Sequence, residues 1–305
     1  MRRGMLFVLL LLLLTQMRPA AAAPGSLASA QIHFGGEART FRTYIPAGLS
    51  EKAVAPLLFI LHGSAGSGED MIAITQHGFE RIADKEKFVV VYPDALERRW
   101  NEQDGTADDV GFLLAIADKL AAESLIDKKR IFVAGISNGG MMAQRLACEH
   151  ADRIAGIATV AGTLPEKLAG VCKPARPVPV LVIHGTADPI VPWNGGPVAG
   201  FAEFGIVLSG PETVAIWTAN NRCRGAALTT TPADRDPQDG TRIRIERYAD
   251  CAVGTAVSLF MVEGGGHTWP GGFQYLPERF IGRTTREIDA NQVIWDFFRQ
   301  FLGSR

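Results

Sequence analysis

The chain has 305 residues, of which 47% are hydrophobic and 21% charged, and this is the composition of an ordinary globular protein rather than a disordered one. Its formal net charge of −1 gives no indication of a nucleic acid or an anionic membrane as a partner. Since no repeat, linker or change in composition follows residue 25, we expect a single domain over residues 23–305.

The first 22 residues have the three parts of a secretory signal peptide. Arg2 and Arg3 are the basic part, residues 5–14 are an apolar run too short to span a bilayer comfortably, and small residues at 20–23 fit a cleavage site. We expect cleavage just before Ala23 and a secreted protein, periplasmic or extracellular, without stable membrane association. An uncleaved anchor is the alternative.

Apolar runs and helical patterns alternate along the rest of the chain. Alternating residues around Gly35-Gly36 predict an antiparallel hairpin of residues 31–34 and 39–45. Further strands or buried apolar runs are expected at 56–61, 88–92, 131–134, 154–160, 179–183, 242–248 and 256–262, and helices up to about residue 85 and at 110–124, from 141 onward, at 212–221 and at 291–302. This order predicts an α/β fold with a mostly parallel sheet and helices on both faces.

One stretch has the pattern of a nucleophile elbow. The apolar run Ile131–Ala134 leads into Gly135-x-Ser137-x-Gly139, and a helical pattern follows. Such a turn lifts the serine hydroxyl out of the sheet, and the glycines let strand and helix approach closely. Ser137 is therefore a candidate nucleophile, and the N–H of Asn138 is a candidate donor to an oxyanion. Because five residues can match by chance, a structural turn is the alternative.

A serine nucleophile needs a base, and the base needs an acid that orients it. His267 follows the last predicted strand in a glycine-rich loop, whereas His62 and His184 directly follow other strands, where we expect them to hold loop backbones. Asp188 follows a strand between the serine and His267. Because each of the three lies at the carboxyl end of a predicted strand, Ser137, Asp188 and His267 can meet as a catalytic triad.

The neighbouring loops offer further site residues. The loop after the first core strand normally supplies the second oxyanion donor, and here it places the N–H of Ser64 in that role. We expect two tryptophans to bind the substrate by forming an apolar wall for an acyl or aryl group: Trp269, which is close to the candidate base, and Trp100, which lies in a polar loop. For both, packing inside the domain is the alternative. Asp108 and Asp109 are expected to cap the helix that follows them.

The four cysteines are expected to form disulfides in an exported protein. Proximity favours Cys148 with Cys172 and Cys223 with Cys251 among the three possible pairings, and each bond would close a loop of roughly 25 residues and contribute on the order of 3 kcal/mol. Buried free thiols are the alternative. None of the four has metal-ligand spacing to another cysteine or histidine, so no metal site is expected.

Taken together, these motifs resemble a known family. They occur in the order His62-Gly63, Tyr92-Pro93-Asp94, Trp100-Asn101, Asp108-Asp109-Val110-Gly111-Phe112, Gly135-x-Ser137-Asn138-Gly139-Gly140-Met141-Met142, His184-Gly185-Thr186-Ala187-Asp188 and Gly266-His267-Thr268-Trp269-Pro270-Gly271. Over about residues 30–302, the chain is similar to the secreted esterases that include polyhydroxybutyrate depolymerases and feruloyl esterases.

The resemblance implies an α/β-hydrolase fold and hydrolysis of carboxylic esters through the triad and an acyl-enzyme, without a metal or organic cofactor. We expect 3-hydroxybutyrate oligomers or polymer as substrate, and a feruloyl or acetylxylan-type ester is the alternative. Many depolymerases of solid polyester carry a separate substrate-binding domain, and its lack here favours oligomers, amorphous polymer or soluble aryl esters. A serine peptidase and a non-catalytic binding protein are two remoter alternatives. The oligomeric state is not predicted.

Overall fold

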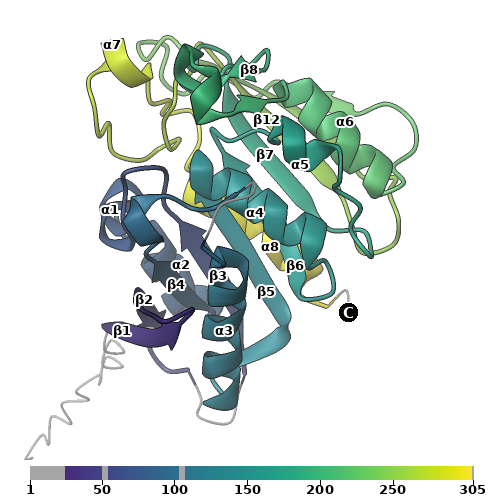
Figure 1. Cartoon of the computed structure of the whole chain (residues 1–305). Helices are drawn as coiled ribbons and strands as arrows, with labels where there is room; N and C mark the ends of the chain where they lie inside the picture. Colours follow the sequence, from purple (N-terminus) through teal and green to yellow (C-terminus); the bar gives the residue numbers. More distant parts are fainter. Residues whose placement is uncertain (1–24, 50–53, 103–106, 304–305) are drawn as a thin grey trace, which may run out of the picture.

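The computed structural model describes residues 25–49, 54–102 and 107–303, so the predicted signal peptide lies outside the described residues. Within these ranges, a ten-stranded sheet has the order β1-β2-β4-β3-β5-β6-β7-β12-β11-β10 (Figure 1). Its strands are β1 (Ser26–Phe34), β2 (Glu37–Ile45), β3 (Ala55–Leu61), β4 (Val89–Pro93), β5 (Ile126–Ile136), β6 (Ile154–Val160), β7 (Val180–Gly185), β10 (Leu228–Thr230), β11 (Arg242–Tyr248) and β12 (Val257–Glu263). The central run from β4 to β12 is parallel, and the outer strands at both edges pair antiparallel.

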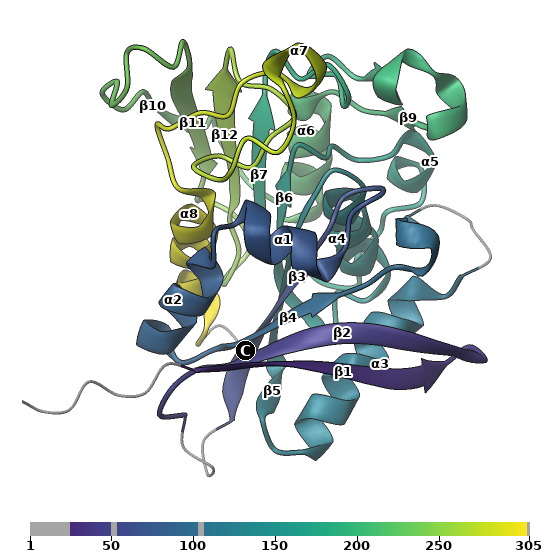
Figure 2. The same ribbon diagram turned by 90° about the vertical axis from the view of Figure 1, so that its left-hand side faces the viewer.

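Helices cover both faces of the sheet, as the alternation of patterns predicts. Every residue of β3, β4, β6 and β7 is buried, which requires apolar side chains on both faces of these strands. One core lies between the sheet and α3 (Asp109–Ala122), α4 (Asn138–Glu149) and α6 (Gly210–Asn220). The other lies under α1 (Gly68–Ile74), α2 (Gly78–Glu86) and α8 (Ala290–Phe298), and Figure 2 shows α2 and α8 on the side of the sheet opposite α3.

The helix expected up to about residue 85 is two helices, which corrects that prediction. α1 ends at Ile74, and Gln76 and His77 take positive φ values of 53° and 54° before α2 begins. The Nδ2 atom of Asn291, on α8, donates a hydrogen bond to the carbonyl of Thr75 at 3.2 Å. This tertiary contact uses a carbonyl that a continuous helix would have occupied, so the break depends on a residue far away in the sequence.

Other boundaries differ by a few residues. α3 begins at Asp109, with the Asp108 side chain capping it by accepting from Gly111 N at 2.7 Å. α8 ends at Phe298 and continues as the 3₁₀ turn η4 (Arg299–Phe301). Short elements that no pattern predicted are β8 (Gly196–Pro197), β9 (Ile206–Val207), β10, α5 (Glu166–Ala169), α7 (Glu278–Ile281), η1 (Leu96–Arg98), η2 (Val198–Gly200) and η3 (Ala202–Phe204).

All four cysteines form disulfides, in the pairing that proximity favours. One bond joins Cys148, in the last turn of α4, to Cys172, and the other joins Cys223, just after α6, to Cys251. The first pair is buried and the second is half-buried. No helix in the described part of the chain has the length and apolar character needed to cross a membrane.

Candidate active site

Ser137 lies at the turn between β5 and α4 with φ 55° and ψ −125°, outside the ordinary regions for a residue with a side chain. Such backbone strain costs on the order of 1–3 kcal/mol and is typical of functional sites. The flanking glycines are required by close packing, because a Cβ atom on Gly139 would lie 2.5 Å from the carbonyl oxygens of Leu61 and His62. The local sequence therefore folds as the elbow that the pattern predicts.

His267 and Asp188 meet in the loops that follow two neighbouring strands. Asp188 comes just after β7 and His267 just after β12, and these strands pair in parallel. The Nδ1 atom of His267 donates to Oδ2 of Asp188 at 2.8 Å. The other carboxylate oxygen accepts the backbone N–H groups of Ile190 and Val191, both at 2.8 Å. The Asp188 side chain is fully buried, and these three donors stabilise the carboxylate there.

A cavity of about 710 Å³ brings Ser137 and His267 together. Because Asp188 engages Nδ1, the Nε2 atom of His267 is the ring nitrogen available to the cavity. No hydrogen bond joins His267 to Ser137 within the described chain, and such contacts often tighten only when a substrate binds. The wall is mostly apolar, from Met71, Ile74, Ile136, Met141, Ile190, Val198, Ala199, Phe204, Phe273, Tyr275, Leu276 and Ile281.

The loop after β3 lies against the elbow. A Cβ atom on Gly63 would lie 3.3 Å from the Cβ of Ser137, and Ser64 and Asn138 both line the cavity. Within the described chain, the backbone N–H groups of Ser64 and Asn138 have no hydrogen-bond partner. Both candidate oxyanion donors therefore lie beside the serine with their N–H groups unused.

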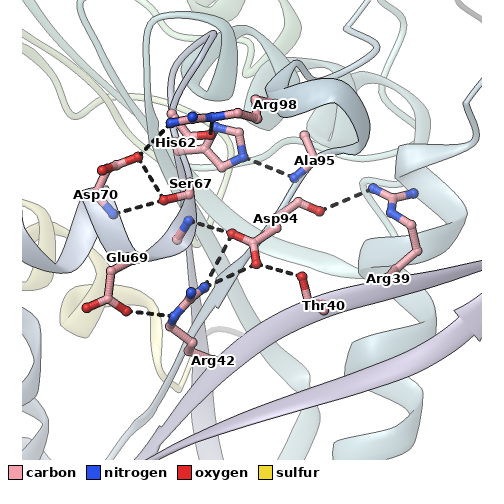
Figure 3. Close-up of polar contacts among 12 residues, drawn as sticks. Arg39, Thr40, Arg42, His62, Ser67, Glu69, Asp70, Asp94, Ala95 and Arg98 are labelled. Carbon is pink, nitrogen blue, oxygen red and sulfur yellow. Dashed lines mark hydrogen bonds and ion pairs between the residues drawn. The ribbon is translucent and has the colours of Figure 1, made fainter.

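His62 holds this loop, as expected from the sequence. Its Nδ1–H donates to the carbonyl of Gly63 at 2.7 Å, and its Nε2 accepts from the N–H of Ala95 at 3.0 Å (Figure 3). Burial lowers the pKa of His62, which keeps the ring in this neutral tautomer. Figure 3 also shows the Asp94 carboxylate binding Thr40 and Arg42, and it accepts from Gly68 N at 2.8 Å. The end of β4 thus fixes the loop that carries Ser64.

His184 has the corresponding role for Asp188. Its Nε2–H donates to the carbonyl of Val191 at 2.9 Å and lies 3.6 Å from Oδ2 of Asp188. The ring is completely buried, and burial lowers the pKa of His184. The neutral imidazole therefore fixes the turn whose N–H groups bind the carboxylate.

The expectation that Trp100 and Trp269 wall the substrate is not met, because neither lines the cavity and both are completely buried. Trp269 donates from Nε1 to Oδ1 of Asn291 at 3.0 Å and packs edge-on against Phe79. Trp100 donates from Nε1 to the carbonyl of His62 at 2.9 Å. Indole rings are apolar with one donor, so a buried site with a single acceptor suits them better than an open wall.

The aromatic residues that line the cavity come instead from two loop segments that the sequence analysis did not single out. Phe204 lies in the segment between β8 and β9, after Asp188, and Phe273 and Tyr275 follow His267. The hydroxyl of Tyr275 donates to the backbone carbonyl of His267 at 2.6 Å, which holds the ring against the cavity. A signal was present, since these aromatic residues stand in glycine- and proline-rich stretches just after the two candidate triad loops.

The acidic groups around the cavity are already paired. Asp70 binds Ser67 and Arg98, Glu102 accepts from Nδ2 of Asn138, and Asp188 is satisfied as described above. Across residues 25–49, 54–102 and 107–303, no group of three or more His, Cys, Asp or Glu side chains is arranged to hold a metal ion.

Comparison with known proteins identifies the family. A family model described as Phospholipase/Carboxylesterase matches residues 93–199. "Putative esterase NocK" of Nocardia uniformis subsp. tsuyamanensis is 34% identical over 299 residues, which are 92% of this chain and 85% of that protein. The chain belongs to the α/β-hydrolase esterase family. It is therefore a carboxylic ester hydrolase of the family that includes feruloyl esterases.

Two further proteins differ in how much of their length this chain covers. "Feruloyl esterase B" of Piromyces equi is 30% identical over 265 residues, which are 84% of this chain but 44% of that protein, so the esterase spans less than half of that relative. The solved structure of an acetyl xylan esterase from Aspergillus awamori superposes with a TM-score of 0.60, covering 90% of this chain and 99% of that one at 14% identity. At this identity the structural likeness supports the fold alone.

Proposed function

We propose that Ser137, His267 and Asp188 are the catalytic triad of this esterase. The observation that carries the proposal is the 2.8 Å contact between His267 and Asp188 at the cavity into which the strained Ser137 elbow opens. His267 takes the proton of Ser137, whose Oγ attacks the ester carbonyl, and the N–H groups of Asn138 and Ser64 receive the oxyanion. His267 then protonates the departing alcohol, and water releases the acid from the acyl-enzyme.

The substrate that we propose first is an ester of plant cell walls, either a feruloyl ester or an acetyl ester of xylan. Relatives that cover most or half of the chain are named for these activities. The cavity walls from Phe204, Phe273 and Tyr275 suit an apolar, planar acyl group, which aromatic side chains contact over a large area.

Oligomers of 3-hydroxybutyrate, which the sequence analysis placed first, are the second candidate, and the surface around the cavity favours them. Phe204, Phe273 and Leu276 line the cavity and are also 47%, 59% and 47% exposed, and Phe201 and Phe280 nearby are 55% exposed. They lie on the β8–β9 and α7 segments, which share one end of the molecule (Figure 1). Clustered exposed apolar side chains are uncommon on soluble proteins and suit an extended aliphatic polyester.

One comparison separates the two candidates. The protein beginning at Ala23 is assayed for release of ferulate from methyl ferulate, acetate from acetylated xylan and 3-hydroxybutyrate from its soluble oligomers, with Ser137→Ala as the blank. Release of ferulate or acetate alone supports a cell-wall esterase, and release of 3-hydroxybutyrate alone supports the depolymerase. If Ser137→Ala keeps the rate, or a serine-reactive phosphonate does not label Ser137, the triad proposal is wrong.

We also infer that the esterase is exported. The two disulfides together use all four cysteines of the chain, and such bonds persist in oxidising compartments. The basic, apolar and small-residue parts of residues 1–22 support the same conclusion. Expression of the full chain followed by N-terminal sequencing of the exported protein tests this, and a product that retains Arg2 and Arg3 would contradict it.

A further inference from the structure

We propose that Trp100 and the side chain of Asn138 form a brace that holds the two oxyanion donors in a fixed relation to each other. The inference rests on the proposed esterase mechanism, in which the N–H groups of Ser64 and Asn138 bind the oxyanion. These donors belong to separate segments, the loop after β3 and the start of α4. Trp100 contacts both segments, so it is a positioning residue rather than a wall of the substrate cavity.

The first arm of the brace reaches the loop that carries Ser64. Nε1–H of Trp100 donates to the carbonyl of His62 at 2.9 Å, and the indole lies against the imidazole with 5.0 Å between ring centroids. The same imidazole donates to the carbonyl of Gly63 at 2.7 Å. The two carbonyls that precede Ser64 in the chain are therefore both fixed by hydrogen bonds, which restricts the orientation of the Ser64 N–H.

The second arm reaches the start of α4. The backbone N–H of Trp100 donates to Oδ1 of Asn138 at 2.7 Å, and Nδ2 of Asn138 donates back to the carbonyl of Trp100 at 3.0 Å. Nδ2 also donates to Oε2 of Glu102 at 2.5 Å. Asn138 is 4% exposed, so its amide is used wholly within the protein. Asn138 is the first residue of α4, so its side chain ties this end of the helix to the backbone of residue 100.

The brace is itself anchored from three elements. The N–H of Asn101 donates to Oδ2 of Asp109 at 2.7 Å, and the other oxygen of Asp109 binds Arg39 of β2. Nη1 of Arg145, on α4, donates to the carbonyl of Asn101 at 2.6 Å. Stabilisation of an oxyanion requires donors that are already in place, and a misplacement of about 1 Å can cost roughly 100-fold in rate. Because residues 99–102 form neither a helix nor a strand, these hydrogen bonds to residue 101 are what keep Trp100 in place.

The test is Trp100→Phe, which removes the donor to His62 and keeps an aromatic ring in the core. We expect kcat to fall about 10- to 100-fold with little change in KM, because the oxyanion forms only after the substrate is bound. Affinity for a boronic acid that adds to the serine should weaken by a similar factor. The matched control is Trp217→Phe, which removes another buried indole donor, to Oε1 of Gln144 at 3.0 Å, and should keep kcat within about twofold.

A double-mutant cycle separates positioning from a general loss of stability. If Trp100 and Asn138 act as one unit, Trp100→Phe combined with Asn138→Ala loses no more activity than the worse single variant. Should Trp100→Phe fold poorly, Asn138→Ala alone removes both hydrogen bonds to the Trp100 backbone without adding a charge and should lower kcat while KM holds. Wild-type kcat and boronic acid affinity in these variants would overturn the brace. If the wild-type protein hydrolyses no ester and a phosphonate does not label Ser137, the proposed function fails and the brace with it.

Discussion

The Nδ1 atom of His267 lies 2.8 Å from Oδ2 of Asp188, although 79 residues separate them in the chain. β7 and β12 are neighbours in the sheet, so the loops that follow them meet at one edge. The N–H groups of Ile190 and Val191 occupy the other carboxylate oxygen, which leaves Oδ2 for the imidazole. This arrangement selects the tautomer with its proton on Nδ1, so Nε2 can accept a proton from Ser137.

Asp188→Asn tests that relationship. The amide can still accept from Ile190 and Val191, but its NH₂ group faces Nδ1 and favours the wrong tautomer of His267. We expect kcat to fall about 10⁴-fold, measured on a p-nitrophenyl ester, with little change in the midpoint of urea unfolding. A loss of less than about tenfold would mean that another acid orients His267.

The buried ion pair between Arg39 and Asp109 should contribute strongly to stability. The side chains are 2% and 0% exposed, and Arg39 also lies over the ring of Phe112. Asp109→Asn leaves a buried guanidinium without its partner charge, so we expect the free energy of unfolding in urea to fall by roughly 3–5 kcal/mol.

An exposed ion pair is the control for Asp109→Asn. Lys119 lies on α3 and Glu123 directly follows this helix, and their side chains are 40% and 44% exposed. Lys119→Ala should change the free energy of unfolding by less than about 1 kcal/mol, because water screens the pair. Equal losses in the two variants would show that burial does not decide the effect.

The two disulfides should differ in their response to reduction. Cys148 and Cys172 are 7% and 5% exposed, whereas Cys223 and Cys251 are half-buried. Under mild dithiothreitol, we expect alkylation at Cys223 and Cys251 before the other pair, as followed by peptide mass spectrometry. Replacing Cys148 and Cys172 together by serine should lower the free energy of unfolding by about 3 kcal/mol, because the bond closes a loop over 24 positions. Simultaneous alkylation of all four would contradict this order.

Burial of His184 should make stability depend on pH below neutrality. Burial lowers the pKa of His184 from its ordinary value of 6.5, so the folded ring stays neutral while the unfolded chain takes up a proton. The contribution of His184 to the free energy of unfolding is complete above about pH 6.5. It decreases as the pH falls from there toward the pKa of the folded protein, because the unfolded state then binds more protons.

His184→Gln removes the titrating group and retains a donor for the carbonyl of Val191. The free energy of unfolding in urea should therefore fall less between pH 7 and pH 5 in this variant than in the wild type. An equal fall in the two proteins would show that His184 does not contribute.

Much of the fold could be predicted from the sequence because the signals are local. Short continuous apolar runs such as those of β3 and β6 are typical of strands buried on both faces, and their alternation with helical patterns leads to a parallel sheet. The elbow could also be predicted from the sequence, since only glycine fits the close packing at positions 135 and 139. Because parallel strands end at the same edge, the positions of Asp188 and His267 after strands were enough to expect their contact.

The rest depends on contacts that no local pattern contains. The sequence around Trp100 and Trp269 does not show whether these side chains line the cavity or are buried. In the structure, their Nε1–H groups donate to the carbonyl of His62 and to Oδ1 of Asn291, inside the protein. The break between α1 and α2 requires Asn291, which is 216 positions from Thr75. From the sequence we could predict the succession of the longer strands and helices along the chain and the residues that follow those strands, since periodicity and glycine sterics act over a few residues. Which side chains line the cavity and which are buried behind it follows only from the tertiary structure, because burial depends on packing between distant segments.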